Sequence, residues 1–303
     1  MKKYKIKKLG INFKFLYNDT IVRGSRKKLL AITNKREIAM FKYEREDYIC
    51  SESCSEKIAY EIAKVLRFEC ARIDLAYDNV GKIGVLNYYF SNVYKSSHTD
   101  IVAYLNKNFT DRNNYYTVSN IKSVLDEIDS NLFKGFIRIM IFDALIGEQD
   151  RHEENWGIIT KNDKFYISPL YDNGDSLLRE FKNYDIAKKY YDGIKNFDSY
   201  IERSKTIIYK ENNIEKYKHF ELIQYLYDNY TMLVIPEIKN LELLTDRLIN
   251  KIVNRIPDEL LTNKHKEYII LYLIKRRNIL LNIIKKGDNY EKWVMVNLEG
   301  TSF

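Results

Sequence analysis

Two aspartates, one before and one after a predicted β-hairpin, limit the folds that the chain can adopt. Asp150 and Asn155 stand five residues apart, directly after a mostly apolar run. Two short apolar runs follow at 156–159 and 165–167, and the polar residues between them predict a β-hairpin. The hairpin brings the second acid, Asp172, back beside Asn155. The fold must therefore provide a rigid support on which these three oxygen-bearing side chains converge.

Such a set of side chains suits the transfer of a phosphoryl group. This reaction needs an acid that orients or deprotonates the attacking hydroxyl, and hard oxygen ligands that hold magnesium against the phosphates. Protein kinases place their base and their second magnesium ligand at the same offset as Asp150 and Asn155. We therefore predict a phosphotransfer site here. The alternative is an exposed acidic loop, because Asp, Arg, His, Glu and Asn are common in solvated turns.

Length and composition bound the class of protein. The 303 residues suit one two-lobed domain or two small ones, and 45% of them are hydrophobic, enough for a large core. No apolar run approaches the ~20 residues of a membrane span, and no apolar segment follows the basic N-terminus as in a secretory signal. The cysteines Cys50, Cys54 and Cys70 are too few for a disulfide framework. We expect reduced thiols and a cytoplasmic protein, with signal-independent secretion left open.

The formal net charge of +8 raises the question of an acidic partner such as nucleic acid. Lys, Ile, Asn and Tyr are all abundant, however, which indicates a general bias in composition. The lysines are spread along the chain with acids nearby. We therefore expect neither a dedicated nucleic-acid surface nor a membrane span.

The first part of the chain reads as antiparallel strands over residues 3–45. One turn between two apolar runs contains Gly24, Ser25 and Lys28 among several basic residues. Exposed backbone amides and cations in such a turn can cradle phosphates. The alternative is an ordinary basic hairpin turn, because the segment has one glycine and not three.

Lys42 and Glu56 are the next candidates. Lys42 lies in a short apolar strand over 37–43, either paired with nucleotide phosphates and a helix carboxylate or extended to solvent at a sheet edge. Glu56 falls in the first turn of a predicted helix, where acids are favoured in any case. Ser53 or Ser55 is expected to cap that helix.

Two further strands are predicted over 72–77 and 82–89, around a turn at Asp78 and Asn79. Residues 86–90 would then form the linker into a helical half. Adenine sites in kinases form at such a crossover. Leu86, Asn87 and Tyr88 are therefore our candidates for nucleotide contact.

Residues beyond about 98 are expected to be mostly helical. Pro236 and Pro257 are expected to break the helical pattern, with a helix starting at Pro257. The basic run at 275–277 is interpreted as a solvated helix face. The predicted helices cover residues 119–130, 132–146, 179–192, 196–210, 214–228, 241–254 and 264–286.

The residues around Asp150 resemble those of a known family. The runs Ile146–Gly157 and Ser168–Gly174, with their Asp-Arg-His-x-x-Asn and Tyr-Asp elements, are similar to those of HipA-like serine/threonine kinases. The similarity extends over roughly residues 20–285. It implies an α+β, two-lobed protein-kinase-like fold, with a small antiparallel β-rich lobe over 1–90 and a larger, mostly helical lobe over 91–303.

The resemblance also implies roles for individual residues. Asp150 would be the base, and Asn155 and Asp172 would bind Mg²⁺. Lys42 would hold the α- and β-phosphates of ATP, and Glu56 would position Lys42. His152 would order the loop or contact the nucleotide, or serve only as a packing residue.

The same resemblance leaves the biology of the protein open. Gly24 to Lys28 matches part of the family's phosphate loop, but Arg23 stands where family members often carry a serine for autophosphorylation. Toxin versions add an N-terminal domain, much of which we expect this chain to lack, so an antitoxin-like partner is only one option. The expected partner is a protein that accepts phosphate. The alternatives are a lipid or small-molecule kinase on the same scaffold and a nucleotide-binding pseudokinase.

Overall fold

A computed structural model gives the fold. It describes residues 1–10, 13–17, 28–33, 36–44, 52–90, 97–105, 111–178, 181 and 184–299. Gly24 and Ser25, the expected phosphate-loop residues, lie outside the described residues, as does Cys50. Cys54 and Cys70 are free thiols. Among the described residues, no helix combines the length and the apolar character needed to cross a bilayer.

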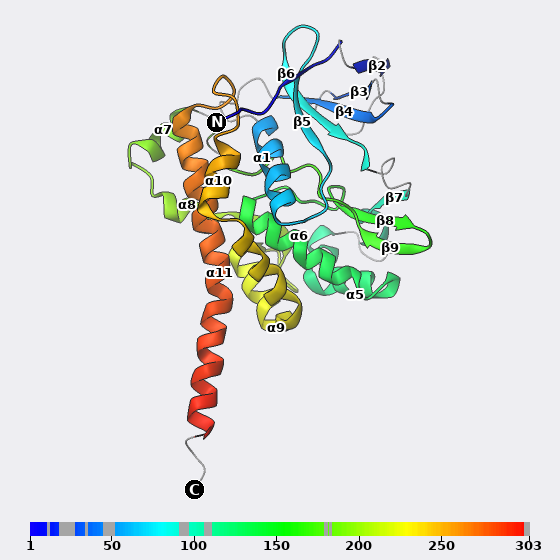
Figure 1. Ribbon diagram of the computed structural model, residues 1–303. Helices are drawn as coiled ribbons and strands as arrows, with labels where there is room; N and C mark the ends of the chain where they lie inside the picture. Colours follow the sequence, from blue (N-terminus) through cyan, green and yellow to red (C-terminus); the bar gives the residue numbers. More distant parts are fainter. Residues whose placement is uncertain are drawn as a thin grey trace.

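A curled six-stranded sheet forms the first part of the chain (Figure 1). The strand order is β1-β5-β6-β4-β3-β2, and all neighbours are antiparallel except β1 and β5. The strands are β1 (Lys7–Lys8), β2 (Phe13–Tyr17), β3 (Lys28–Thr33), β4 (Ile38–Tyr43), β5 (Ile73–Tyr77) and β6 (Ile83–Tyr88). The strands predicted over 37–43, 72–77 and 82–89 are confirmed, with small shifts at their ends.

The predicted linker was placed too early in the chain. Leu86, Asn87 and Tyr88 lie within β6, which pairs with β4 on one side and β5 on the other. Val85 faces one hydrophobic cluster while Leu86 and Tyr88 face another, so both sides of the strand are covered. A strand buried on both faces reads as a continuous apolar run, and this hid its true end. The connection to the helical half begins only at Tyr89.

Helix α1 (Glu52–Val65) packs on β5 and β6 and lies between the sheet and the other helices (Figure 1). Its side chains Ile58, Ala59, Ile62 and Ala63 are fully buried. The predicted serine cap is wrong, because Ser53 and Ser55 lie inside the helix. Instead, the carboxylate of Glu44 accepts hydrogen bonds from the backbone N–H groups of Glu52 and Ser53. The residue after β4 thereby holds the start of α1.

Helices dominate the second half of the chain. They are α3 (Val102–Leu105), α4 (Arg112–Tyr115), α5 (Val118–Ile128), α6 (Leu132–Ile146), α7 (Tyr184–Tyr191), α8 (Phe197–Arg203), α9 (His219–Lys239), α10 (Asp246–Val253) and α11 (Asn263–Glu299), with a 3-10 turn η2 (Asn240–Leu243). Helix α6 is buried along most of its length and packs against α5, α9 and α11. It ends at Ile146, is capped by Gly147 and leads directly into the segment with Asp150. The expected α+β architecture is confirmed.

A three-stranded sheet contains the predicted hairpin. β8 (Gly157–Lys161) and β9 (Lys164–Ile167) pair antiparallel. Asn162 and Asp163 form the turn with φ values of 50° and 57°, the left-handed conformation that Asn and Asp tolerate in two-residue hairpins. The hairpin prediction is confirmed. β7 (Ser97–Asp100) pairs with β8, and this strand was not predicted.

Two predicted helices each contain a strand. β10 (Lys205–Tyr209) falls within the predicted helix 196–210, and β11 (Lys216–Lys218) within 214–228. The two strands pair antiparallel. Thr206, Ile207 and Ile208 are β-branched and buried, which favours a strand over a helix once the neighbour is in place.

The proline prediction is confirmed only in part, because Pro257 lies in the non-helical stretch between α10 and α11. Pro236 lies inside α9 and does not end it. Met232, four residues before it, is exposed, so water can replace the hydrogen bond that proline removes. No helix starts at Pro257, because α11 begins at Asn263.

The basic run at 275–277 is not a solvated face. Arg276 is fully buried, and Arg277 is 9% exposed. Arg277 donates hydrogen bonds to the carbonyl of Leu244 and to the carboxylate of Asp246, at 2.6 Å each. Helix α11 packs against α6, α9 and α10, so neighbouring helices cover it on several sides.

Candidate active site

The structure brings Lys42, Glu56 and Asp172 together from three separate elements. The Lys42 Nζ atom lies 3.5 Å from Glu56 Oε1 and 3.1 Å from Asp172 Oδ1. Lys42 and Glu56 are buried, whereas the side chain of Asp172 is 30% exposed. The lysine therefore joins the strand β4, the helix α1 and the segment after the hairpin.

A second lysine lies beside Lys42. Lys28 on β3 stands directly opposite Lys42 on β4, so both side chains project from the same face of the sheet. Like charges in directly opposed positions destabilise a strand pair. The carboxylates of Glu56 and Asp172 already offset the charge of Lys42. Lys28, a predicted phosphate contact, is thus placed where two cations can face one anion.

Glu56 links helix α1 to the Asp172 segment. Its Oε2 atom accepts a hydrogen bond from the backbone N–H of Asn173 at 3.2 Å, and its Oε1 atom faces Lys42. Burial raises the pKa of Glu56, and the ammonium of Lys42 opposes this shift. The carboxylate is therefore held between a cation and a backbone donor, a setting that fixes α1 relative to Asp172.

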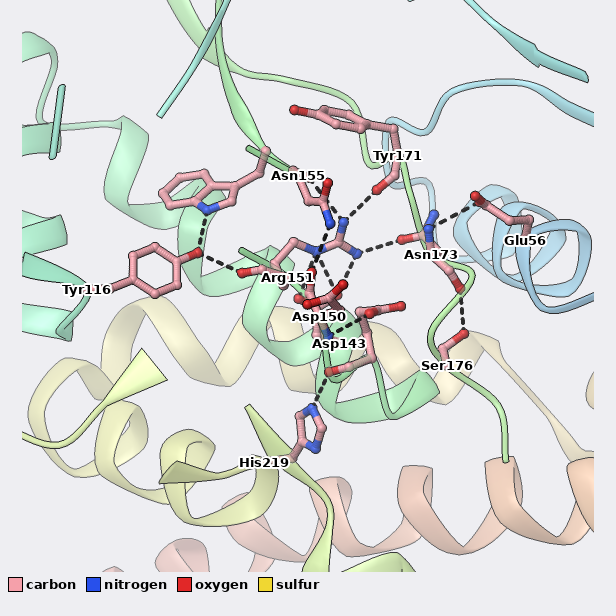
Figure 2. Close-up of polar contacts among 12 residues, drawn as sticks. Glu56, Tyr116, Asp143, Asp150, Arg151, Asn155, Tyr171, Asn173, Ser176 and His219 are labelled. Carbon is pink, nitrogen blue, oxygen red and sulfur yellow. Dashed lines mark hydrogen bonds and ion pairs between the residues drawn. The ribbon is translucent and has the colours of Figure 1, made fainter. Parts of the chain in front are cut away.

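Arg151 is the centre of the hydrogen-bond network (Figure 2). Its guanidinium binds both carboxylate oxygens of Asp143 at 2.9–3.3 Å. It also donates to the backbone carbonyls of Asn155 and Tyr171 and, at 2.6 Å, to Asn173 Oδ1. A single buried side chain thus ties α6 to the loop and to the residues on both sides of Asp172.

Asp143 and Asn173 are the residues of the site that the sequence did not reveal. Burial raises the pKa of Asp143, and the charge of Arg151 opposes this shift. Burial alone would lower the pKa of Arg151. The charge and hydrogen bonds of the Asp143 carboxylate outweigh this effect, so the pKa is raised. The available signal was an isolated acid inside the apolar run of α6. Asn173 gave no signal beyond its position next to Asp172.

The loop that carries Asp150 closes on itself. The backbone N–H of Asp150 donates to Glu148 Oε1, and its carbonyl accepts from Asn155 Nδ2, each at 2.8 Å. The carboxylate of Asp150 is half-buried and has no hydrogen bond or ion pair with the described residues. Asn155 commits its amide nitrogen to the loop, so its Oδ1 is the atom that could bind a metal.

His152 lies at the edge of the same loop and is half-buried. Its Nδ1 atom accepts a hydrogen bond from the backbone N–H of Glu154 at 3.2 Å. In the neutral ring the proton then sits on Nε2, which can donate to an anion. Its part in nucleotide contact stays a prediction.

The donor atoms of this site suit magnesium. Asp172 adopts a left-handed backbone (φ 54°), a conformation that is costly for a non-glycine residue and that tends to occur at functional sites. Among the described residues, no group of three or more His, Cys, Asp and Glu side chains forms a metal cage. Magnesium at nucleotide sites typically uses one or two carboxylates and completes its shell with phosphates and water. Asp172 and Asn155 fit that pattern.

A known structure shares this fold. A proinflammatory kinase of Helicobacter pylori, CtkA, aligns with a TM-score of 0.74 and 16% identity, over 93% of this chain and 99% of that chain. HipA from a Shewanella oneidensis MR-1 toxin–antitoxin complex with HipB and operator DNA aligns with a TM-score of 0.47 and 15% identity, over 88% of this chain and 65% of that chain. The first likeness shows the protein-kinase-like fold that the sequence predicted. No match was found among curated proteins.

The family itself is shown by the sequence. A model of the HipA-like C-terminal domain matches residues 20–221, more than half of the chain. The matched range includes Lys42, Glu56, the Asp150 loop and Asp172. The protein therefore belongs to the HipA-like C-terminal domain family.

Proposed function

We propose that the protein is a protein kinase that uses ATP and Mg²⁺ and transfers the γ-phosphoryl group to a serine or threonine hydroxyl. The observation that carries this proposal is the meeting of Lys42 with Glu56 and Asp172. In protein kinases such a strand lysine holds the nucleotide phosphates and a helix glutamate positions it. Residues 1–90 would form the nucleotide-binding lobe and residues 91–303 the lobe with Asp150.

Each residue has a defined task in this proposal. Asp150 orients the acceptor hydroxyl and takes its proton, since its carboxylate is the half-exposed acid of the loop. Lys42 and Lys28 offset the charge of the phosphates. Asn155 and Asp172 would hold the metal, which when bound stabilises the negative charge on the transferring group. Most of the rate comes from positioning and charge stabilisation, so the rigid support around Arg151 matters as much as the acid.

The decisive experiment is transfer of radiolabel from ATP to the protein itself or to a generic protein acceptor. Asp150→Asn should lower the rate by at least roughly 100-fold and leave Mg-ATP binding nearly unchanged. Asp163→Asn is the matched control, because it makes the same chemical change in the exposed hairpin turn, where Asn is equally suited. It should transfer phosphate at the wild-type rate.

Two outcomes would contradict the proposal. A wild-type protein that binds Mg-ATP but transfers no phosphate would be a nucleotide-binding regulator. Transfer to lipids or small molecules, but to no protein, would assign a different acceptor class to the same site. An antitoxin-like partner and a cytoplasmic location stay predictions from the sequence.

A further inference from the structure

Arg276 on α11 is a fully buried cation whose hydrogen bonds all go to uncharged oxygens. Its Nε atom donates to the carbonyl of Ala144 at 2.6 Å. Its Nη1 atom lies 3.1 Å from the carbonyl of Ile201, 2.6 Å from Ser204 Oγ and 3.1 Å from the hydroxyl of Tyr272. Within the described residues it forms no ion pair with a carboxylate. A buried charge of this kind requires another source of negative potential.

Two helix ends provide that potential. Ala144 lies in the last turn of α6, and Ile201 lies in the last turn of α8. The carbonyl groups at a helix C-terminus carry the negative end of the helix dipole. Arg276 therefore caps both helices and fixes α11 to the point where α6 turns into the loop with Asp150.

His219 extends this contact to the loop itself (Figure 2). Its Nε2 atom lies 2.7 Å from the carbonyl of Glu148, and its Nδ1 atom lies 3.0 Å from Ser204 Oγ. A carbonyl can only accept, so Nε2 must carry the ring proton. Burial, and next the charge of Arg276, lower the pKa of His219 to about 3, so the ring is neutral and Nδ1 is an acceptor.

The direction of every hydrogen bond in this chain of contacts is thereby set. Arg276 donates to Ser204 Oγ, Ser204 donates its single proton to His219 Nδ1, and His219 Nε2 donates to the Glu148 carbonyl. Ser204 Oγ also lies 3.0 Å from the Ile201 carbonyl, which accepts from Arg276 as well, but among the described residues His219 Nδ1 has no donor other than Ser204. With the ring proton on Nδ1 instead, His219 could not donate a hydrogen bond to the backbone carbonyl of Glu148.

This chain of contacts ends at Asp150. Glu148 is buried, and its Oε1 atom accepts the backbone N–H of Asp150 at 2.8 Å. Gly147, with φ 71°, lies in the chain between Ala144 and Glu148. The carbonyls of these two residues accept hydrogen bonds from Arg276 and His219. A Cβ at Gly147 would lie 1.9 Å from the hydroxyl of Tyr272, so the turn fits closely against α11.

We propose that His219 is a positioning residue for Asp150. It transmits the placement of α11, through Arg276 and Ser204, to the backbone that aims the acid at the acceptor. The effect on the reaction rests on the proposed kinase function, whereas the effect on the loop backbone does not. Loss of the Nε2–H donor should therefore lower the rate of transfer without lowering the affinity for the nucleotide, since Lys42 and Asp172 lie on other elements.

The test compares His219→Leu with His219→Gln. Leucine removes the donor to the Glu148 carbonyl, whereas the side-chain amide of glutamine can replace it. We expect kcat to fall roughly 10- to 100-fold in His219→Leu and to return to within roughly threefold in His219→Gln, with KM for ATP unchanged in both. Amide hydrogen exchange across residues 147–156 should be faster in His219→Leu alone.

A matched control is available in His265 on α11, which is also buried and binds the Tyr191 hydroxyl at 2.9 Å. His265→Leu removes a comparable side chain far along the chain from the loop, so its kcat and its exchange at 147–156 should stay at the wild-type level. Ser204→Ala should lower kcat in the wild type but add nothing in the His219→Leu background, because the two residues act in series.

The outcomes separate the two proposals. Faster exchange in His219→Leu without any transfer by the wild-type protein would refute the kinase function and support the fixing of the loop. Unchanged exchange and unchanged kcat in His219→Leu would overturn the role of His219. An equal loss of kcat in His265→Leu would overturn it as well, because the effect would then be one of general stability.

Discussion

The ion pair between Arg151 and Asp143 permits a prediction that separates stability from activity. Both side chains are 3% exposed. Removing one partner of a buried pair typically costs about 3–5 kcal/mol, because the other charge is left uncompensated. Asp143→Leu should therefore lower the free energy of unfolding by about 3 kcal/mol or more, a large share of the ~5–15 kcal/mol that a domain has.

The double variant should be less damaged than the single variants suggest. In Asp143→Leu with Arg151→Met neither charge of this pair remains, and the loss comes from three acceptors that Arg151 used to bind. At about 1 kcal/mol for each hydrogen bond, the double variant should lose about 3 kcal/mol. Arg151→Met alone combines both losses and should be the least stable of the three.

Activity should not follow stability. Arg151 holds the carbonyl of Tyr171 and the side chain of Asn173, the two neighbours of Asp172, as well as the carbonyl of Asn155. Without it Asn155 and the neighbours of Asp172 lose their fixed geometry, and displacements near 1 Å can cost about 100-fold in rate. The double variant should be folded and nearly inactive.

Urea denaturation followed by tryptophan fluorescence gives the three free energies, and radiolabel transfer gives the rates. The reasoning fails if the losses of the single variants simply add in the double variant, because the two charges would then be independent. It also fails if the double variant recovers both stability and rate, because Arg151 would then do no more than neutralise the charge of Asp143.

Further predictions concern titration, charge and backbone strain. The stability advantage of wild type over His265→Gln should shrink by roughly 2 kcal/mol from pH 7 to pH 4.5 in urea denaturation, because the folded-state pKa is lowered to about 4 and only the unfolded histidine binds a proton in that range. Lys42→Met should weaken Mg-ATP binding roughly tenfold by calorimetry, and Glu56→Gln less. Gly147→Ala should lower the melting temperature, and adding Tyr272→Phe should relieve only the contact with the hydroxyl.

Local patterns were sufficient for much of the site. The hairpin β8–β9 and the helix α6 follow from apolar periodicity and turn residues within a few positions of each other. The pairing of Lys42 with Glu56 was also predicted, because a strand lysine followed by a helix acid is a known arrangement. Their meeting depends only on α1 packing over the sheet.

Non-local partners explain the errors. Ser97–Asp100 has no apolar alternation and becomes a strand only because β8, about sixty residues later, offers its edge. Arg276 was expected in water because an arginine is normally exposed. Its burial depends on the carbonyl ends of α6 and α8, which the tertiary fold brings to α11. No window of sequence around position 276 contains that information.

Burial alternates along the loop that carries Asp150, and this pattern has a consequence for how variants of this protein should be interpreted. Glu148, Arg151 and Asn155 are buried and support the loop, whereas Asp150 and His152 between them are half-exposed. Chemistry and support are thus interleaved within a single short segment. A support residue holds the acid by its backbone, so its loss lowers kcat much as loss of the acid would. Loss of activity alone therefore cannot identify the base. The discriminating measurement is hydrogen exchange of the loop, which Asp150→Asn should leave unchanged and a variant of a support residue should accelerate.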